Sequence, residues 1–263
     1  MTTRPTSAAS SSSSPRVAPA RPELKDQVAL VTGASSGIGE SIAVALGASE
    51  AIVCLVGRRR EELERVLDRV GRRADRARAY PVDLTRDDEV RVLAGRIEAD
   101  FKRLDVLVHC AGTISLGPLD EAPAEALDAQ YAANVRAPYQ LTQALLPLIR
   151  ANQGQIVFIN SSVGKRAPGS GVGQFAATQH ALKALADSLR DEVNADGVRV
   201  LSVFPGRTAT PRQQLLHQLE AKEYVPERLM QPEDVASTVL GALALPRTAE
   251  ITEISIRPLL KPA

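Results

Sequence analysis

The sequence predicts a single α/β domain built on a doubly wound parallel sheet with helices on both faces. Short runs of Val, Ile and Leu alternate with longer amphipathic segments from about Gln27 to Ile256, and no linker interrupts them. Strands that are apolar throughout are typical of parallel sheets covered by helices on both faces. A chain of 263 residues, 44% of them hydrophobic, is long enough to bury such a core.

The expected elements follow one another as repeated strand and helix units. The predicted strands are 28–31, 51–56, 77–82, 105–108, 155–159, 198–204 and 251–256. The predicted helices are 38–46, 61–70, 87–101, 127–149, 173–193 and one that begins at Pro232. Proline favours the first turn of a helix and disrupts its interior. We therefore expect Pro138 and Pro147 to bend or end the helix at 127–149.

The first 22 residues differ in composition from the rest. They are rich in Ser, Ala, Pro and Arg, with a serine run from Ser10 to Ser14 and no acidic residue. Such a segment cannot bury enough apolar surface to fold, and it lacks the apolar core of a secretion signal. We expect residues 1–22 to form a disordered tail and residues 23–263 to form the domain.

Charge and hydropathy exclude several classes of partner. The 32 basic and 31 acidic side chains give a formal net charge of +1, which provides no field to hold nucleic acid or an anionic membrane. No run of 18 apolar residues is present to span a bilayer. Cys54 and Cys110 fall in short apolar runs typical of buried parallel strands, which indicates reduced thiols. His109 is expected to be structural, and His180 and His217 have no acidic or cysteine partner at metal-ligand spacing. A cytoplasmic protein without a metal site is predicted.

A glycine-rich turn, Thr32-Gly33-Ala-Ser-Ser-Gly37-Ile-Gly39, joins the first predicted strand to the first helix. This position makes the pattern specific for a dinucleotide, because the helix N-terminus faces the phosphates. The three glycines would permit a tight turn, backbone approach to a pyrophosphate, and packing of helix on strand. An ordinary glycine-rich turn is the alternative. The candidate cofactor-binding residues here are Gly33, Ser35, Ser36, Gly37, Ile38 and Gly39.

The second predicted strand ends at Gly57, followed by Arg58 and Arg59. An acidic residue here would bind the ribose 2′-hydroxyl of NAD and would repel a 2′-phosphate, whereas a guanidinium binds that phosphate. The arginines therefore favour NADP(H). The alternative is that they are only the solvated start of a charged helix.

Five motifs in order make residues 25 to 258 resemble the short-chain dehydrogenase/reductase family, which has a Rossmann-like fold. They are the glycine-rich turn, Asp83-Leu84, Cys110-Ala111-Gly112, the segment 173–183 and the loop Pro205-Gly206-Arg-Thr-Ala-Thr210. The resemblance implies hydride transfer between NADP(H) and a small carbonyl or imine-type substrate. It assigns adenine contacts to Asp83 and Leu84, further cofactor contacts to Ala111 and Gly112, and nicotinamide contacts to Pro205, Gly206, Thr208 and Thr210. His109 and Cys110 replace two asparagines of the family.

The same resemblance locates the catalytic residues. Asn134 and Ser162 match the family's Asn and Ser, whereas Phe175 and Gln179 stand where its Tyr-x-x-x-Lys pair is expected. Phe175 keeps the ring but has no proton to donate. Gln179 can bind a ribose hydroxyl of the cofactor but carries no charge with which to shift a pKa. We therefore expect ordinary ketone reduction to be weak or absent.

Three interpretations remain open at this stage. In the first, the protein transfers hydride to an acceptor such as an iminium ion, which needs no proton donor. In the second, it is a non-catalytic NADP(H)-binding subunit or sensor that pairs with an active partner of the same fold. In the third, the changes to Phe175 and Gln179 were introduced to inactivate it. The helices at 127–149 and 173–193 correspond to the family's usual dimer surfaces and predict a homo- or hetero-oligomer. The substrate is decided by the loop after Pro205 and the helix around 212–224, which follow no general code.

Overall fold

The computed structural model describes residues 21–71, 76–167, 169–220 and 222–260. The predicted tail lies outside these residues except for Arg21 and Pro22. The backbone N–H of Arg21 donates to Ser49 Oγ (2.9 Å), and a short 3₁₀ helix, η1, spans Pro22–Leu24. Because Leu24 is buried in the core, the described fold starts at Arg21, ahead of the predicted boundary at residue 23.

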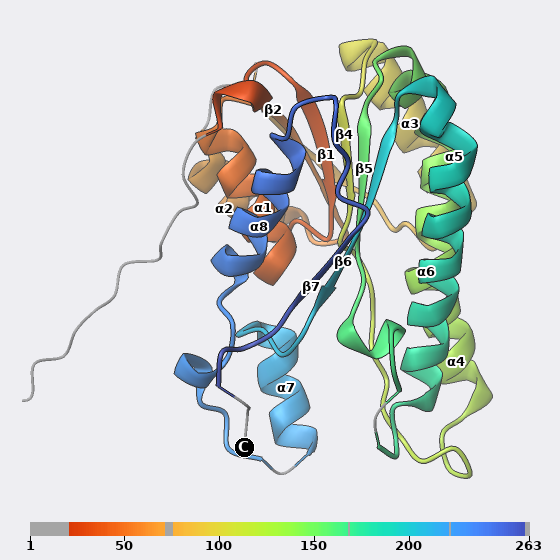
Figure 1. Cartoon of the computed structure of the whole chain (residues 1–263). Helices are drawn as coiled ribbons and strands as arrows, with labels where there is room; N and C mark the ends of the chain where they lie inside the picture. Colours follow the sequence, from red (N-terminus) through yellow and green to blue (C-terminus); the bar gives the residue numbers. More distant parts are fainter. Residues whose placement is uncertain (1–20, 72–75, 168, 221, 261–263) are drawn as a thin grey trace, which may run out of the picture.

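A seven-stranded sheet forms the centre of the molecule, and every pair of neighbouring strands is parallel (Figure 1). The strands are β1 (Val28–Thr32), β2 (Ile52–Gly57), β3 (Ala77–Pro81), β4 (Val106–His109), β5 (Gln155–Ile159), β6 (Arg199–Pro205) and β7 (Glu253–Ile256). Their order in the sheet is β3-β2-β1-β4-β5-β6-β7. The predicted fold class is confirmed.

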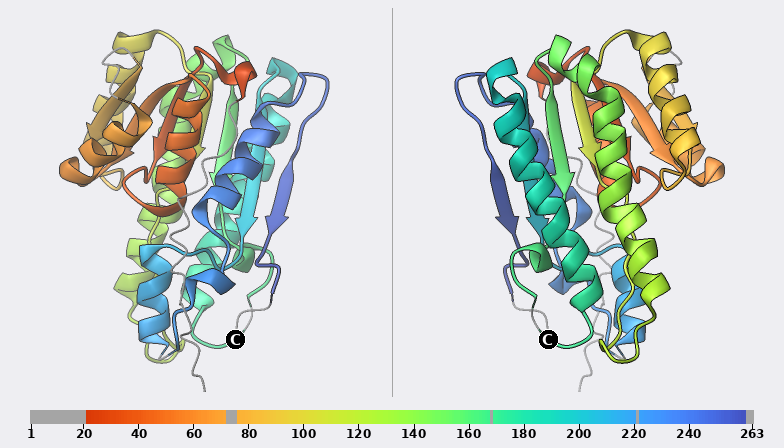
Figure 2. Two further views of the ribbon diagram at one scale, coloured as in Figure 1. Left: turned by 90° about the vertical axis from the view of Figure 1, so that its left-hand side faces the viewer. Right: turned by 90° about the vertical axis from the view of Figure 1, so that its right-hand side faces the viewer.

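Helices cover both faces of the sheet (Figures 1 and 2). The first layer is made of α1 (Gly37–Ala48), α2 (Arg60–Val70) and α8 (Pro232–Leu243). The second is made of α3 (Asp87–Phe101), α4 (Ala124–Tyr131), α5 (Ala137–Ala151) and α6 (Gly173–Val193). Strand β1 separates two apolar clusters: Ala29 and Val31 belong to one, Val28 and Leu30 to the other. Side chains alternate across a strand, so covering both faces requires the continuous apolar run.

The segment expected as one helix at 127–149 is longer and contains a π-helical stretch. Between α4 and α5 lies η2 (Ala132–Arg136). Pro138 lies in the first turn of α5 and Pro147 inside it, and neither ends the helix. The expectation that these prolines end it is wrong, because a helix can continue where packing supports the carbonyls that proline leaves unbonded. The π-helical stretch carries Asn134, and such bulges are frequent at functional sites.

The order of connections reverses between β1 and β4, which are neighbours in the sheet although β2 and β3 separate them in sequence. In open α/β sheets, ligands bind beyond the carboxyl ends of the strands at such a point. Helix α7 (Pro211–Leu219) and the short 3₁₀ helix η3 (Ser162–Gly164) follow β6 and β5 at this edge. Figure 1 shows α7 beyond this carboxyl edge, below the sheet. The edge therefore carries the candidate site.

Candidate cofactor and active site

The turn between β1 and α1 is packed so closely that its glycines leave no room for side chains. A Cβ on Gly39 would lie 2.3 Å from the carbonyl oxygen of Gly33, and one on Gly33 would lie 2.8 Å from the backbone of Ala111. Gly33 and Gly37 also have φ angles of 66° and 58°, which L side chains rarely adopt. Ser36, at the N-cap of α1, makes no side-chain bond to the first turn. This turn fits a pyrophosphate, which needs close backbone and exposed N–H groups.

Thr32 ties this turn to the end of β4. Its Oγ1 donates to the carbonyl of Val108 (3.3 Å) and accepts the N–H groups of Cys110 and Ala111, both at 3.0 Å. The hydroxyl therefore sets the distance between the glycine-rich turn and the Ala111-Gly112 segment.

His109 and Cys110, which replace the family's asparagines, are packing residues. The His109 ring stacks on Phe158 with centroids 4.9 Å apart, and its Nε2 hydrogen-bonds Thr142 Oγ1 at 2.8 Å. Burial lowers the pKa of His109 to about 3 and raises the pKa of Cys110 to about 12. Both are therefore neutral at physiological pH. Cys110 follows β4 and is half-buried, which corrects its expected position inside the strand.

Arg58 and Arg59 act on different neighbours. Burial raises the pKa of Asp83, but hydrogen bonds from Thr85 and the charge of Arg58 outweigh burial and hold that pKa below its usual value. Arg58 thus acts electrostatically on Asp83, the residue expected to contact the adenine. Arg59 lines a surface groove of about 330 Å³ together with Ser36 and Gly37 of the turn. Of the two, Arg59 is the one placed against the glycine-rich turn.

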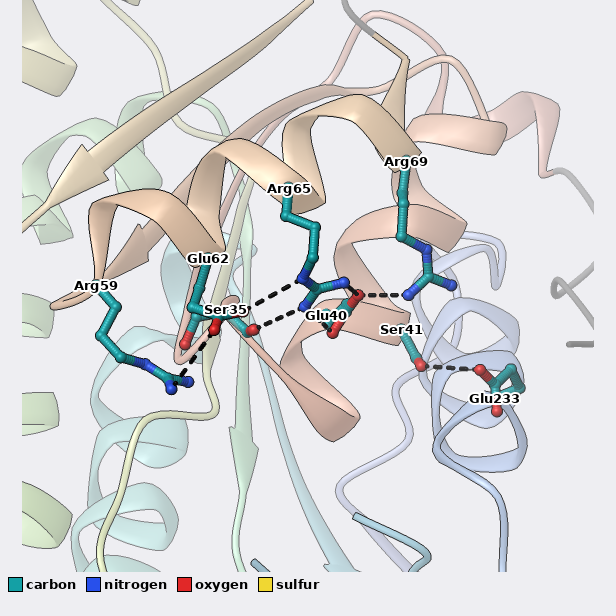
Figure 3. Close-up of polar contacts among 8 residues, drawn as sticks. All are labelled: Ser35, Glu40, Ser41, Arg59, Glu62, Arg65, Arg69 and Glu233. Carbon is teal, nitrogen blue, oxygen red and sulfur yellow. Dashed lines mark hydrogen bonds and ion pairs between the residues drawn. The ribbon is translucent and has the colours of Figure 1, made fainter. Parts of the chain in front are cut away.

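Sequence reasoning missed an ion cluster behind this turn, in which two exposed arginines bind the buried carboxylate of Glu40 (Figure 3). Arg65 binds both carboxylate oxygens of Glu40, at 2.7 and 3.0 Å, and donates to the carbonyl of Ser35 at 3.2 Å. Arg69 also binds Glu40. Burial raises the pKa of Glu40, yet the two guanidiniums hold it below its usual value. The i, i+4 spacing of Arg65 and Arg69 on one helix face was the only signal in the sequence.

Asn134 links three segments at the catalytic end. Its Oδ1 accepts the N–H of Thr113 at 2.7 Å, and its Nδ2 donates to the Thr113 carbonyl (2.9 Å) and to Thr178 Oγ1 (3.1 Å). The π-helical stretch, the segment after β4 and α6 therefore meet at this amide. Thr178 immediately precedes Gln179.

The other three catalytic candidates lie on η3 and α6. Ser162 is the exposed first residue of η3, and Phe175 is half-buried in the first turn of α6. Gln179 is buried one turn later, and its backbone carbonyl accepts a hydrogen bond from Asn160 Nδ2 at 3.0 Å. Asn160 follows β5 directly, so this bond joins the Ser162 segment to the active-site helix.

Lys183 and Tyr80, a nearby ammonium and a phenol, each bind an acidic side chain. Lys183 forms ion pairs with Asp187 and Glu253. The Tyr80 hydroxyl donates to Asp100 at 2.7 Å. Neither side chain therefore takes the place of Phe175 or Gln179 in this structure.

The Pro205-Gly206 loop lies over the glycine-rich turn. The methyl group of Thr210 would be 3.0 Å from a Cβ on Gly37, and Thr210 Oγ1 accepts the N–H of Gln213 (3.1 Å) to cap α7. Thr208 is buried and forms an isolated parallel bridge with Met230. The loop is therefore held on both sides, next to the phosphate position.

Within the described ranges, no helix is long and apolar enough to cross a membrane. The same part of the chain contains no group of three or more His, Cys, Asp or Glu side chains that could hold a metal ion.

This sheet, with a glycine-lined phosphate position at its point of reversal, defines a Rossmann-type dinucleotide fold. The model of the short chain dehydrogenase family matches residues 27–221, and the chain belongs to this family.

Relatives and solved structures agree with this assignment. The chain is 30% identical over 236 residues to an uncharacterized oxidoreductase of Staphylococcus aureus, covering 89% of this chain and 98% of that protein. An alcohol dehydrogenase from Thermococcus sibiricus, complexed with 5-hydroxy-NADP, superposes with a TM-score of 0.81 at 26% identity, over 91% of this chain and all of the other. A short chain dehydrogenase from Burkholderia cenocepacia in complex with NADP gives 0.78 at 29%, over 89% and 97%.

Proposed function

We propose that the protein is an NADP(H)-binding oxidoreductase that transfers hydride to a small carbonyl or imine-type acceptor, and that it reduces ordinary ketones weakly or not at all. The observation that carries this proposal is a glycine-rich turn too closely packed for side chains, in the same site as helix α6, which carries Phe175 and Gln179. The absence of a proton donor, and not a defect of the fold, would limit the rate of ketone reduction.

The residues at the carboxyl edge fit NADP(H). The glycine-rich turn suits the pyrophosphate, Arg59 and Arg58 suit the 2′-phosphate, and Asp83 lies where the adenine is expected. Two solved family members of similar fold hold NADP-type cofactors. When bound, the nicotinamide supplies or accepts the hydride.

The protein side chains would then orient the acceptor without protonating it. Ser162 offers a hydroxyl at the start of η3, and Gln179 offers an amide that can bind a ribose hydroxyl. General-acid catalysis typically contributes about 10² to 10⁴ in rate, and Phe175 cannot provide it. An acceptor that already carries positive charge needs no such proton, so this site favours an iminium ion over a neutral ketone.

A second candidate function is that of a non-catalytic NADP(H)-binding subunit or sensor, paired with an active partner of the same fold. It is favoured by large apolar side chains exposed along α4 and α5: Leu127 is 37%, Tyr131 50% and Tyr139 52% exposed. Exposed aromatic residues are enriched where proteins associate. This face would bind the partner, and either function is compatible with a cytoplasmic protein.

Restoring the missing pair tests the proposal. The double substitution Phe175→Tyr and Gln179→Lys reintroduces a phenol and the charge that lowers its pKa. NADPH-dependent reduction of an activated dicarbonyl should then rise by at least about 10²-fold over the unmodified chain. Each single substitution should do much less, because a phenol without the ammonium keeps a pKa of about 10.

The possible outcomes separate the candidates. A double variant that binds NADPH but reduces nothing favours the partner-subunit function. Robust ketone reduction by the unmodified chain would contradict the proposal, because it would reveal another proton donor.

A further inference from the structure

Arg212 brings a positive charge to the end of β4 without an acidic partner. Its Nη2 donates to the carbonyl oxygen of Gly112 at 2.5 Å, although the two residues are 100 positions apart. Among the described residues, this guanidinium forms no ion pair with a carboxylate. Arg212 is exposed, and its bond to Gly112 lies at the surface of the site.

The contact lies at the catalytic end of the site. A Cβ on Gly112 would be 2.9 Å from Asn134 Oδ1, the atom that accepts the N–H of Thr113. Asn134 is in turn bonded to Thr178 of the active-site helix. Arg212 therefore stands next to the residues that surround the reacting atoms, whereas Arg58 and Arg59 stand at the adenine end.

Arg207, which precedes Arg212 in the same loop, differs from it because Arg207 is paired with a carboxylate of the protein. Its Nη2 binds both carboxylate oxygens of Glu220, at 2.8 and 3.2 Å. Arg212 has a single backbone carbonyl in place of a carboxylate. A guanidinium that is bound only to a backbone carbonyl keeps donors with which it can bind a carboxylate bidentately.

We propose that Arg212 binds a carboxylate of the substrate, so that the acceptor belongs to the class of carbonyl or imine compounds that carry a carboxylate, such as 2-oxo acids and their imines. This inference rests on the proposed function, because it names the substrate class of that site.

Binding of small carboxylates and their uncharged amides tests this proposal without turnover. Formate, acetate and benzoate are each titrated against formamide, acetamide and benzamide by calorimetry, with and without saturating NADPH. At least one carboxylate should bind about tenfold more tightly than its amide. Arg212→Gln should abolish this preference, whereas Arg228→Gln, which removes an exposed charge from the following 3₁₀ helix, should retain it.

The affinity for NADPH distinguishes the cofactor from the substrate as the partner of Arg212. We expect Arg212→Gln to change the NADPH dissociation constant by less than about threefold. A loss of tenfold or more, without any carboxylate preference in the unmodified chain, would assign the guanidinium to the cofactor phosphates and overturn the proposal.

Two further results complete the design. If Arg212→Gln fails to fold, Arg212→Lys keeps the charge but loses the bidentate geometry, and it should retain a weakened preference for the carboxylate. If the unmodified chain prefers carboxylates but binds no NADPH, this result contradicts the proposed function and supports a carboxylate site at Arg212. Equal binding of every carboxylate and its amide by the folded chain would refute the anion site alone.

Discussion

Phe175 and Gln179 alter the chemistry of α6 without altering how the helix is held. The bond from Asn160 reaches the backbone carbonyl of Gln179, which any residue at that position would offer. Asn134 holds the helix through Thr178 and not through Gln179. The local geometry therefore does not depend on the lysine that the family carries, and this is why the double substitution is a usable test.

At the adenine end, we predict that Arg59 contributes more to NADPH selectivity than Arg58. Arg59 lies beside Ser36 and Gly37, whereas Arg58 acts on Asp83. A lost charge-assisted hydrogen bond costs about 1.5–3 kcal/mol, so Arg59→Asp should weaken NADPH binding by at least about tenfold, and Arg58→Asp should weaken it less. Titration of NADPH and NADH measures both effects.

Arg60→Asp is the control for this series, because Arg60 is exposed on the first turn of α2 and does not line the groove. An equal loss of NADPH affinity in Arg60→Asp would mean that Arg59→Asp acts only through long-range electrostatics and not through a direct contact. Tighter binding of NADH than NADPH by the unmodified chain would overturn the cofactor assignment.

Glu40 predicts an acid-sensitive contribution to stability. Its pKa is lowered in the folded protein, so the carboxylate stabilises the fold at pH values above its unfolded pKa, near 4.5, and this stabilisation is lost as pH falls through the folded value. Thermal unfolding of Glu40→Gln and of the unmodified chain should therefore differ most near pH 7. The difference should shrink below about pH 4.5.

Glu62→Gln serves as the control, since Glu62 pairs with Arg65 from a more exposed position, 38% accessible against 9% for the Glu40 side chain. Its effect on melting should be small at every pH, because exposed ion pairs contribute about 0–1 kcal/mol. A Glu40→Gln protein as stable as the unmodified chain at pH 7 would show that the cluster does not stabilise the fold.

At the scale of elements, α1 and the glycine-rich turn form one unit whose packing excludes side chains. The tightest point is Gly39, whose added Cβ would lie 2.3 Å from the Gly33 carbonyl oxygen. Helix and turn therefore cannot separate to admit a methyl group without moving the phosphate position.

We predict that Gly39→Ala lowers both the melting temperature and the affinity for NADPH. Gly95→Ala in α3 is the matched control, because nothing lies within 4 Å of its added Cβ. Alanine is favoured over glycine inside a helix by about 1 kcal/mol, so the control should be as stable as the unmodified chain or slightly more stable. Full NADPH affinity in folded Gly39→Ala would contradict the role assigned to this turn.

At the scale of the whole molecule, one sheet with two helical layers holds both ends of the site. Residues from β1 to the loop after β6 converge on its carboxyl edge, and the described fold starts at Arg21, close to the buried side chain of Leu24. Activity and stability therefore belong to a single cooperative unit.

We predict that removing residues 1–20 changes the melting temperature by less than about 2 °C, because the composition of this segment offers little apolar surface to bury. Removing residues 1–24 should lower it by about 4 °C or more. The longer deletion takes away the buried Leu24 side chain, worth about 1.5–3 kcal/mol, and the bond to Ser49. A large loss from the shorter deletion would mean that the tail packs on the fold.

The sequence by itself determined the fold class, the order of strands and helices, and the glycine-rich turn. These depend on local periodicity and on backbone freedom at Gly33 and Gly37, which are properties of short segments. The family's spacing also located Asn134, Ser162, Phe175 and Gln179 on their elements, and their roles remain predictions.

Only the tertiary structure decided which distant side chains meet. Glu40 and Arg65 are 25 positions apart, and Gly112 and Arg212 are 100 apart. The π-helical stretch at Asn134 likewise depends on packing that no local pattern records. Such contacts follow from the order of the strands in the sheet and from the packing of the helices against it, and these are properties of the assembled chain.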